Sequence, residues 1–545
     1  MNAKQLHQLA LSVFGKRSKL MNLWQELADN FYPERADFTY QRTVGTDFAA
    51  NAMTSYPFLC RRDLGDQIGT MLRPTAKEWF HMITKDPSRR NNEATRWLEY
   101  SAQVMRNAMY DRQSQFTVAA KQADHDFACF GQSVTSLRLS RHRDHLLYRC
   151  WHLRDVAWIE NENGAIGAVF RKMKPTARDM YRLWGAKCDP KIVRAATGTD
   201  DSALEEIECM HIVVEADMYD DKTRFGWWSI YYDTKHETML EAVAIPMNEY
   251  NIARWQTVSG SQYSFSPATI VALPEARLLQ SMTYTLLEAG EKVTNPPMLA
   301  TQDVVRSDVA IFAGGITWVD RDYDERLGAA LRHMEIDGKG LPFGAEMQRD
   351  SRGLLQQCFY LNKLTMPQRG PEMTAYEVGQ RVQEYIRGAL PIFEPMEVER
   401  NGADCEMTFN LMLRNGAFGS PADMPKSLQG AEVEFAFESP LHDAIKAQKG
   451  HKFEQMASLI AIAAKLDENA LNLPDATEAL RDALDGISIP AKWVRPPEEV
   501  EAMAAKRNQE QDVAKALAAM QQGSEVAANL AGAQRDRSQA EAVPA

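Results

Sequence analysis

The strongest constraint on the fold is a long apolar seam in the middle of the chain. Over residues 274–294 the apolar side chains recur at spacings of 3, 4, 3 and 4, at Leu279, Met282, Leu286, Ala289 and Val293. This periodicity places them on one side of an α-helix. Pro274 suits the first helical turn, and Pro296 with Pro297 ends the helix. The sequence therefore predicts one long amphipathic helix over this segment.

Two more helices are predicted downstream. The second covers residues 344–362 and carries on one side Met347, Leu354, Leu355, Cys358 and Leu361. The third covers residues 374–390, begins with the capping box Thr374-x-x-Glu377 and ends near Gly388. Together the three helices form the framework around which we expect the chain to be organised.

A short loop separates the second helix from the third. Residues 364–371 contain two prolines and a glycine, which keep the segment out of a helix, and the cations Lys363 and Arg369 lie at its flanks. A loop this short between two long helices indicates a scaffold rather than a pocket. The two charges are either solvated or directed at a ligand, and the sequence alone leaves both interpretations open.

Composition narrows the class of protein. The chain has 545 residues, of which 45% are apolar and 25% charged, values typical of a globular protein of two to four domains. Its net charge of −12 argues against a surface that grips nucleic acid throughout. The seven cysteines have no CxxC spacing, which indicates reduced, mostly buried thiols in a protein made in a cytoplasm. No signal peptide or run of about 18 apolar residues is visible, so neither secretion nor membrane insertion is expected.

The predicted fold class is α+β with an antiparallel sheet. Residues 1–125 have helical periodicity, and Trp79 with Phe80 is expected to be exposed after a helix. A glycine, Gly131, is expected to close a further helix. After it the period falls to two, which predicts a short helix at 176–184 and strands at 133–139, 146–150, 155–160, 165–171, 208–215, 226–233 and 239–243.

The remaining segments are assigned more coarsely. Residues 298–340 form a β-type insert with a hairpin around Gly314 and Gly315. A strand is expected at 432–437, followed by a helix that contains Phe453, Met456, Leu459, Ile460 and Ala463. From Pro496 the chain is rich in Ala, Gln and Glu without aromatic residues, which predicts a helix and then a disordered tail.

Motifs for common chemistries are missing from the sequence. It contains no GxxxxGK[ST], GxGxxG, HExxH or GxSxG pattern. The run Asp320-x-Asp322-x-Asp324 resembles the start of a calcium loop, but Glu325 and Leu331 stand where that loop needs Gly and Glu. We therefore predict no catalytic residue, no metal site and no cofactor.

Two clusters of ionisable residues have alternative interpretations. His125 lies between two aspartates, but successive residues point apart on a helix, which favours a structural role over a metal site. The most basic local run comprises Arg138, Arg141, His142, Arg143, His145 and Arg149. It could touch nucleic acid, but alternation along strands puts only half of it on one face, which favours a solvated turn or a subunit contact.

The order of these segments resembles the portal, or head-to-tail connector, proteins of short-tailed bacteriophages. No single motif is specific, and the resemblance depends on an ordered set over roughly residues 15–500. The set consists of 64–80 (ending LRPTAKEWF), 126–131 (DFACFG), the hairpin 155–171, 267–297 (with ALPEARLL and AGEKVTNPP), 373–384 and 409–440 (with LRNGAFGSPADMP).

The resemblance implies an architecture of named parts. It implies a mainly helical wing with antiparallel β elements, long stem helices, a β-type clip insert and a helical C-terminal crown. Carried onto this chain, the parts are the wing (1–265), stem helix 1 (266–297), the clip (298–340), stem helix 2 (341–362), the tunnel loop (363–372), the long wing helix with following strands (373–440), the crown (441–522) and a disordered tail (523–545).

The resemblance also implies a function without an active site. It implies a ring of about twelve copies at one capsid vertex of the virion, assembled in the host cytoplasm, with double-stranded DNA passing through the axis during packaging and ejection. Partners would be the terminase motor, the major capsid and scaffolding proteins, and tail adaptor proteins, without a membrane. The seam on the first stem helix needs a partner, which neighbouring copies would supply.

The expected site residues follow from these parts. The tunnel loop would present Lys363, Gln368 and Arg369 to DNA, and the clip would present Phe312 and Trp318 to partners. The subunit interface of the stem would consist of Leu279, Met282, Leu286 and Val293. Two alternatives remain from the sequence: a metal-dependent nuclease with an unrecognised carboxylate site, and a tail adaptor that forms a smaller ring.

Overall fold

A computed structural model gives the architecture of the chain. It describes residues 1–43, 45–50, 52–74, 78–89, 91–198, 201–220, 222–300, 331–334, 338–364, 394–420, 423–437 and 456–460, with single positions elsewhere. The chain divides into two compact units. The first comprises 1–81, 101–420 and 435–442, and the second comprises 82–100, 421–434 and 443–545.

Helices make up the beginning of the first unit. α1 (Ala3–Lys16) starts with a capping box between Asn2 and Gln5, and α2 (Ser18–Phe31) and α3 (Tyr56–Leu72) follow it. α4 (Asn92–Met109) continues from the second unit into the first, and α5 (Phe116–Phe130) follows. Eleven of the residues of α5 are buried, which makes it the central helix of the unit.

Gly131 ends α5, as the sequence predicts. Its φ of +71° is a left-handed conformation that L side chains rarely adopt. A Cβ atom at this position would lie 2.0 Å from the carbonyl carbon of Phe265. Glycine is therefore required both by the backbone conformation and by the close approach of the chain that leads into the stem.

Two antiparallel sheets follow α5. The first has the order β3-β2-β9, with β2 (Gln132–Leu139), β3 (Leu146–Trp151) and β9 (Tyr250–Arg254). The second has the order β4-β5-β6-β7-β8, each strand paired with the next in the chain. Its strands are β4 (Val156–Glu160), β5 (Ile166–Met173), β6 (Cys209–Glu215), β7 (Trp227–Asp233) and β8 (Thr238–Ile245). The predicted α+β class and every predicted strand of this region are confirmed, and β9 was missed.

Helices cover the five-stranded sheet on both faces. Leu6, Ala10 and Val13 of α1 pack on one face against a cluster that includes Phe170 and Ile212. On the other face α6 (Ala177–Trp184) and α7 (Pro190–Thr197) pack around Cys209 and Leu240. Because neighbouring strand residues point to opposite faces, Cys209 and Met210 belong to different cores.

Short elements complete the first unit. They are α8 (Ala216–Tyr219), the strand pair β10 (Gln256–Thr257) and β11 (Ser264–Phe265), α11 (Leu361–Leu364), a π-helix (Glu397–Gly402), α13 (Ala403–Arg414) and 3₁₀ turns at Pro33–Arg35, Arg112–Ser114, Gly185–Lys187 and Asp201–Leu204. The long helices α9 and α10 are described with the functional site.

The described part of the second unit is small. β1 (Phe80–Thr84) pairs with β14 (Val433–Phe437), and both strands cross the boundary between the units. Within the second unit, Lys85 Nζ lies 3.0 Å from a carboxylate oxygen of Glu432. Short 3₁₀ turns occur at Pro87–Arg89 and Lys426–Leu428, and residues 456–460 are helical, within the helix predicted there. The strand predicted at 432–437 is confirmed.

The prediction that Trp79 and Phe80 are exposed is wrong. Both side chains are buried, at 0% and 2% exposure. Trp79 stacks on Phe437 with ring centroids 6.2 Å apart, and Phe80 contacts Phe435 edge to face. The aromatic side chains that cover Trp79 and Phe80 belong to a strand more than 350 residues downstream. Local periodicity cannot indicate such a distant contact.

A buried ion network fixes α5 against its neighbours. Asp124 of α5 pairs with Arg73, which caps the C-terminus of α3, and with Arg400 of the π-helix. Arg73 also donates to Asn401 at 2.7 Å, and Arg400 donates to the carbonyl of Ala120 at 2.7 Å. All three charged side chains are at most 5% exposed, so the two guanidiniums and the carboxylate compensate one another away from water.

We expect Asp124→Ala to destabilise the first unit strongly. The substitution leaves two buried arginines without the carboxylate that they share, which costs about 3–5 kcal/mol. The matched control is Asp63→Ala, which removes an exposed carboxylate paired with Arg62 and costs about 0–1 kcal/mol. Thermal denaturation followed by circular dichroism measures both. Equal melting temperatures of the two variants would contradict the structural role of Asp124.

Candidate functional site

The most prominent candidate site is a helical hairpin, here named the stem hairpin, made of α9 and α10. α9 (Pro267–Thr294) begins where the Ser266 side chain accepts a hydrogen bond from the amide of Thr269, and Pro267 occupies the first helical position. The prediction that this helix begins at Pro274 is wrong, because Pro274 lies inside it and is exposed. The lost backbone hydrogen bond is tolerated because the first turns are anchored elsewhere.

That anchor is α5. Ser266 Oγ donates to the carbonyl of Ala128 at 2.8 Å, and Thr269 Oγ1 donates to the carbonyl of Cys129 at 2.7 Å. These bonds use carbonyls at the C-terminal end of α5. They fix where α9 starts and in which direction it leaves the core.

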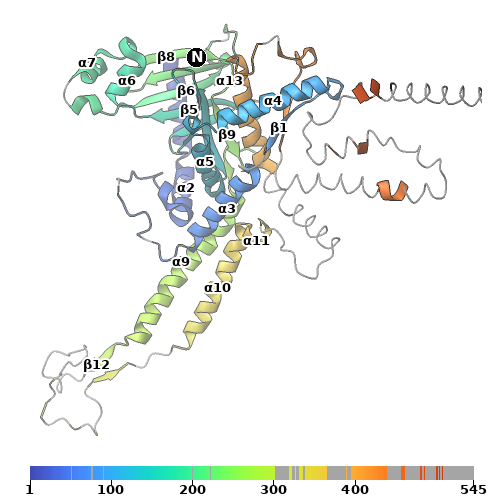
Figure 1. The fold of residues 1–545 in the computed structure, drawn as a ribbon. Helices are drawn as coiled ribbons and strands as arrows, with labels where there is room; N and C mark the ends of the chain where they lie inside the picture. The colour runs from blue at the N-terminus through green and yellow to red at the C-terminus, as the bar shows by residue number, and fades with distance from the viewer. Residues whose placement is uncertain are drawn as a thin grey trace, which may run out of the picture. The chain divides into compact units, whose positions relative to one another are not determined.

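α10 (Gly340–Cys358) runs antiparallel to α9 over its lower part (Figure 1). Gln348 donates to Thr283 Oγ1 at 2.8 Å, and a Cβ atom at Gly344 would lie 2.6 Å from a methyl carbon of Leu286. Gly344 therefore permits the close approach of the two helices. The prediction placed this helix at 344–362, whereas the structure begins it four residues earlier and ends it at Cys358.

The predicted seam of α9 faces α10 of the same chain. Leu279 is fully buried, and Leu286 packs against Gly344. Met282 is half-buried, and Val293 is 38% exposed although it lies near Gly338, whose Cβ atom would be 3.6 Å from a Val293 methyl group. The partner that the seam needs is thus available within the chain, and the role of these four residues in subunit contact stays a prediction.

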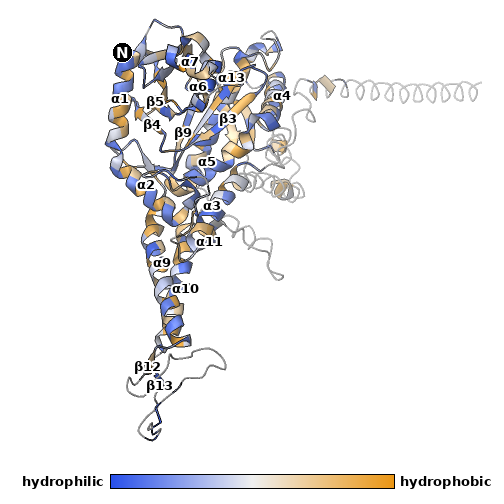
Figure 2. Ribbon diagram, turned by 90° about the vertical axis from the view of Figure 1, so that its left-hand side faces the viewer, coloured by the Kyte–Doolittle hydropathy of each residue, from blue (hydrophilic) through white to orange (hydrophobic). Residues whose placement is uncertain are grey.

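A different set of apolar side chains on the stem hairpin is exposed. We name it the apolar face, and it consists of Val271, Leu278, Phe343, Met347 and Leu354. Positions 343, 347 and 354 fall on one stripe of α10, and positions 271 and 278 fall on one stripe of α9. Each stripe lies about a quarter turn from the Leu286–Gly344 contact, in the same rotational sense along its own helix, so in this antiparallel pair both stripes lie on the same side of the hairpin. Figure 2 shows hydrophobic positions along both helices.

The correction for α10 follows from this arrangement. The sequence places Met347, Leu354, Leu355 and Cys358 on one side, but only Leu355 is fully buried against the core. Met347 and Leu354 point away from it and are exposed. The apolar side of α10 is wide, so one part of it packs against the core and another part stays uncovered. Helical periodicity alone does not tell these two parts apart.

The opposite side of the stem hairpin is partly covered by its own chain. Gln280 Oε1 accepts hydrogen bonds from the amides of Met53 and Thr54 at 2.7 and 3.0 Å. Arg352 lies 5.5 Å from the ring centroid of Tyr56. Farther from the core, α9 exposes Tyr284 and Leu287, the latter at 58%. The hairpin thus carries uncovered apolar groups on two sides.

The end of the stem hairpin leads into a pair of strands. β12 (Met298–Ala300) and β13 (Leu331–His333) pair antiparallel, with Met298 opposite His333. The insert that the sequence predicts as β-type at 298–340 therefore has short strands at 298–300 and 331–333. Trp318 is 69% exposed, whereas Phe312 and most of the predicted hairpin at 309–319 lie outside the described residues.

The predicted DNA-contacting loop is described only at its start. Lys363 belongs to α11, is exposed and lies 5.8 Å from the ring centroid of Tyr360. Gln368, Arg369 and the rest of the loop lie outside the described residues. The same holds for the predicted helix at 374–390, apart from Gly388, which is helical.

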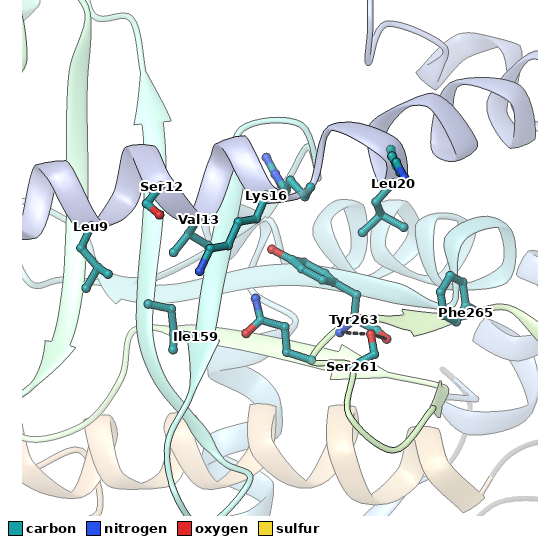
Figure 3. Close-up of a pocket in the computed structure, with 12 residues that line it drawn as sticks. Leu9, Ser12, Val13, Lys16, Leu20, Ile159, Ser261, Tyr263 and Phe265 are labelled. Carbon is teal, nitrogen blue, oxygen red and sulfur yellow. Dashed lines mark hydrogen bonds between the residues drawn. The ribbon is translucent and has the colours of Figure 1, made fainter.

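A cavity of about 560 Å³ under α1 is a second candidate site (Figure 3). Tyr263 lies beneath the helix, and Lys16 and Lys19 line the same cavity. Arg17 also lines it, but its guanidinium donates to the carbonyls of Leu153 and Val156. The titratable groups of this lining are three cations and a tyrosine whose pKa burial raises, a set without a nucleophile paired to a base.

His125 and the two aspartates beside it have structural partners. Asp124 pairs with Arg73 and Arg400, and Asp126 pairs with Arg35 at 2.7 Å. His125 Nδ1 lies 3.0 Å from a guanidinium nitrogen of Arg61. These three side chains thus face four different arginines, and no two of them share one.

The cysteines are not disposed for thiolate chemistry. All seven are free, and burial raises the pKa of Cys60 to about 12. Among the described residues, no group of three or more His, Cys, Asp or Glu side chains could hold a metal ion. None of the described helices combines the length and the hydrophobicity that crossing a bilayer requires.

Comparisons with known proteins give relatives along the whole chain. The chain is 23% identical to a probable portal protein of Bordetella phage BPP-1, covering 96% of this chain and 95% of the relative. It is 22% identical to the portal protein of Salmonella phage epsilon15, covering 97% and 95%. A chain from the virion of a native gene transfer agent particle aligns over 79% of this chain and 95% of its own length, at 7% identity and a TM-score of 0.32.

A family model decides the assignment. The model described as bacteriophage head to tail connecting protein matches residues 3–494. The match includes the stem hairpin, both sheets and the helices that anchor them. The chain therefore belongs to the bacteriophage head to tail connecting proteins, and its role is that of a structural connector between head and tail.

Proposed function

We propose that this chain assembles into a closed ring of about twelve copies at the capsid vertex, in which stem hairpins of adjacent copies contact one another. The observation that carries the proposal is the apolar face together with Tyr284 and Leu287 on the opposite side. In a ring each copy meets two neighbours through two different surfaces. A hairpin with uncovered apolar groups on both sides suits such a heterologous contact.

The ring would provide a channel for double-stranded DNA during packaging and ejection. In this proposal the loop with Lys363, Gln368 and Arg369 reaches the channel and contacts phosphates. The net charge of −12 supports a conduit, because a wall that bound phosphate tightly would slow the sliding of DNA. A few cations in one loop could contact the DNA without holding it along the whole channel.

The parts predicted from the sequence keep their proposed roles. Residues 298–340, with Phe312 and Trp318, would form the clip that meets tail adaptor proteins and the terminase motor. Residues 1–265 would form the wing towards capsid and scaffolding proteins, and 441–522 the crown. We infer that the chain is not an enzyme and that ATP hydrolysis belongs to the separate motor. The family assignment supports this over a nuclease or a smaller-ring adaptor.

The first prediction concerns the wild-type protein. Purified chains of 61.6 kDa should form closed rings of about a dozen copies with a central hole. Native mass spectrometry gives the copy number, and negative-stain microscopy shows the symmetry. Monomers or dimers at both low and high salt would contradict autonomous ring assembly.

The second prediction tests the apolar face. Phe343→Asp combined with Leu354→Asp should leave the fold intact, since both side chains are exposed in the isolated chain. It should shift the protein from rings to monomers, because each large apolar side chain lost from a buried contact costs about 1.5–3 kcal/mol per interface.

The control for that experiment is Glu346→Lys, an exposed change on α10 that removes no apolar surface. Size-exclusion chromatography with light scattering compares ring yields. Leu286→Asp is a poorer probe, because Leu286 packs against Gly344 within the chain and its loss would disturb the hairpin itself. Full ring yield in the Phe343 and Leu354 double variant would overturn the proposed interface.

The third prediction separates assembly from DNA handling. Lys363→Ala combined with Arg369→Ala should leave rings intact and lower the amount of DNA retained in filled particles, because two phosphate contacts per copy are removed. Quantitative DNA measurement on purified particles checks this. Unchanged DNA retention, with normal rings, would remove these two residues from the proposed channel.

A further inference from the structure

The basic run of the sequence forms part of a cleft to which the proposed ring and DNA channel assign no role. Five arginines from different elements line this arginine cleft, namely Arg138 of β2, Arg141 of the following turn, Arg149 of β3, Arg171 of β5 and Arg182 of α6. Its volume is about 620 Å³. The run was expected to put half of its residues on one face, and the cleft takes three of the six.

Strand register explains why these side chains converge. Arg138 lies opposite Leu147, and Arg149 lies opposite Ser136, in the antiparallel pair β2 and β3. Residues opposite each other, and residues two apart, share a face of a sheet. Arg138 and Arg149 therefore project to the same side, where β5 brings Arg171 and α6 brings Arg182.

The cleft has an excess of positive charge. Among the described residues, the carboxylates that line it are Asp179 and Glu241, against five guanidiniums. Within the described part of the chain, none of the five arginines has a carboxylate at ion-pair distance. Asp179 accepts a hydrogen bond from Thr176, and Glu241 accepts one from Trp184 Nε1 at 3.2 Å.

The neighbouring ionisable groups reflect this excess. Burial, and then the charges of Arg138 and Arg171, lower the pKa of Arg149. Burial raises the pKa of the neighbouring Glu249, while the charges of Arg138 and Arg171 act in the opposite direction. Unpaired arginines this close together repel one another, so an anion brought among them is stabilised by all of them.

Arg171 makes the cleft a built site rather than a loose surface cluster. It is 7% exposed, its Nε donates to the Tyr250 hydroxyl at 2.7 Å, and its guanidinium lies 3.9 Å from the Trp151 ring centroid. Tyr250 in turn bonds to His211 at 2.6 Å. The guanidinium is thus held in one place before any ligand arrives, which lowers the entropic cost of binding.

The aromatic groups of the cleft do not favour nucleic acid. Single-stranded nucleic acid needs free ring faces for base stacking. Arg171 already covers a face of Trp151, and His211 stacks on Tyr231 with centroids 4.1 Å apart. The two lining carboxylates would also repel a chain of phosphates, whereas a peptide has N–H groups to offer them.

The apolar residues that line the cleft also favour a polypeptide as its ligand. Leu183 is 54% exposed, and Met173 and Pro175 also line the cleft. We propose that the arginine cleft binds an acidic segment of another polypeptide chain. Its Asp or Glu carboxylates pair with the arginines, and an apolar side chain covers Leu183.

The test uses the full-length protein and a fluorescein-labelled peptide, Gly-Asp-Glu-Leu-Asp-Glu-Leu-Gly. Fluorescence anisotropy at low and at physiological salt measures its binding. The comparison probes are the same peptide with Asn and Gln in place of its acids, and an eight-nucleotide oligothymidine. The acidic peptide should bind, and the neutral one should bind at least tenfold more weakly.

Two double variants assign the binding to the cleft. Arg138→Gln with Arg182→Gln changes two exposed lining residues and should weaken peptide binding at least tenfold. Lys191→Gln with Arg194→Gln removes the same charge from the exposed side of α7 and should change binding less than twofold. Equal effects of both double variants would mean unspecific attraction and overturn the proposal. So would absence of peptide binding, or tighter cleft-dependent binding of the oligonucleotide.

Discussion

The pairing of Asp124 with two buried arginines is the interaction on which the rest of the first unit depends. It joins the end of α3, the middle of α5 and the π-helix, at residues 73, 124 and 400. A buried charge must be compensated by an opposite charge. If one of the three segments moved away, the charges that stayed buried would be uncompensated, at a large cost in free energy. The carbonyls of Ala128 and Cys129, one turn farther along α5, receive Ser266 and Thr269 at the start of α9. The buried ion network therefore holds the helix to which the stem hairpin is anchored.

The stem hairpin changes character with distance from that root. Near the core α9 buries Leu273, Ala276 and Leu279, whereas farther out it exposes Tyr284 and Leu287. Two helices alone cover only one side of each other, and a helix pair in water is stabilised mainly by the apolar surface that it buries. The outer half therefore gains most from contact with other copies. Anchoring at one end and exposure at the other suit a connector whose subunits fold first and then assemble.

Local sequence patterns predicted where helices and strands lie better than they predicted which elements pack against one another. Period-two alternation located the strands, and Gly131 located the end of α5, because these features depend on nearby residues. The same patterns could not show that the seam around Leu286 faces α10 or that Phe343 remains exposed. A packed side and an uncovered side of a helix have the same pattern when both are apolar. Trp79 stacks on Phe437 and Asp124 pairs with Arg400, each hundreds of residues away, and nothing in the local sequence marks either pairing. The arginine cleft was visible only as half of a basic run, because β5 and α6 complete it.

Arginine has opposite roles in the network and in the cleft, and the difference lies in its partners. Arg73 and Arg400 share the buried carboxylate of Asp124 and are not available to bind a ligand. The cleft arginines have no such carboxylate partner among the described residues. The chain as a whole carries a net charge of −12, so an acidic partner is repelled at long range. At physiological salt, charges act over about 8 Å, so the local excess of the cleft outweighs the repulsion only once the partner is close. Such a cleft would give little attraction at a distance and strong selection at contact, which suits recognition of a particular acidic segment during assembly.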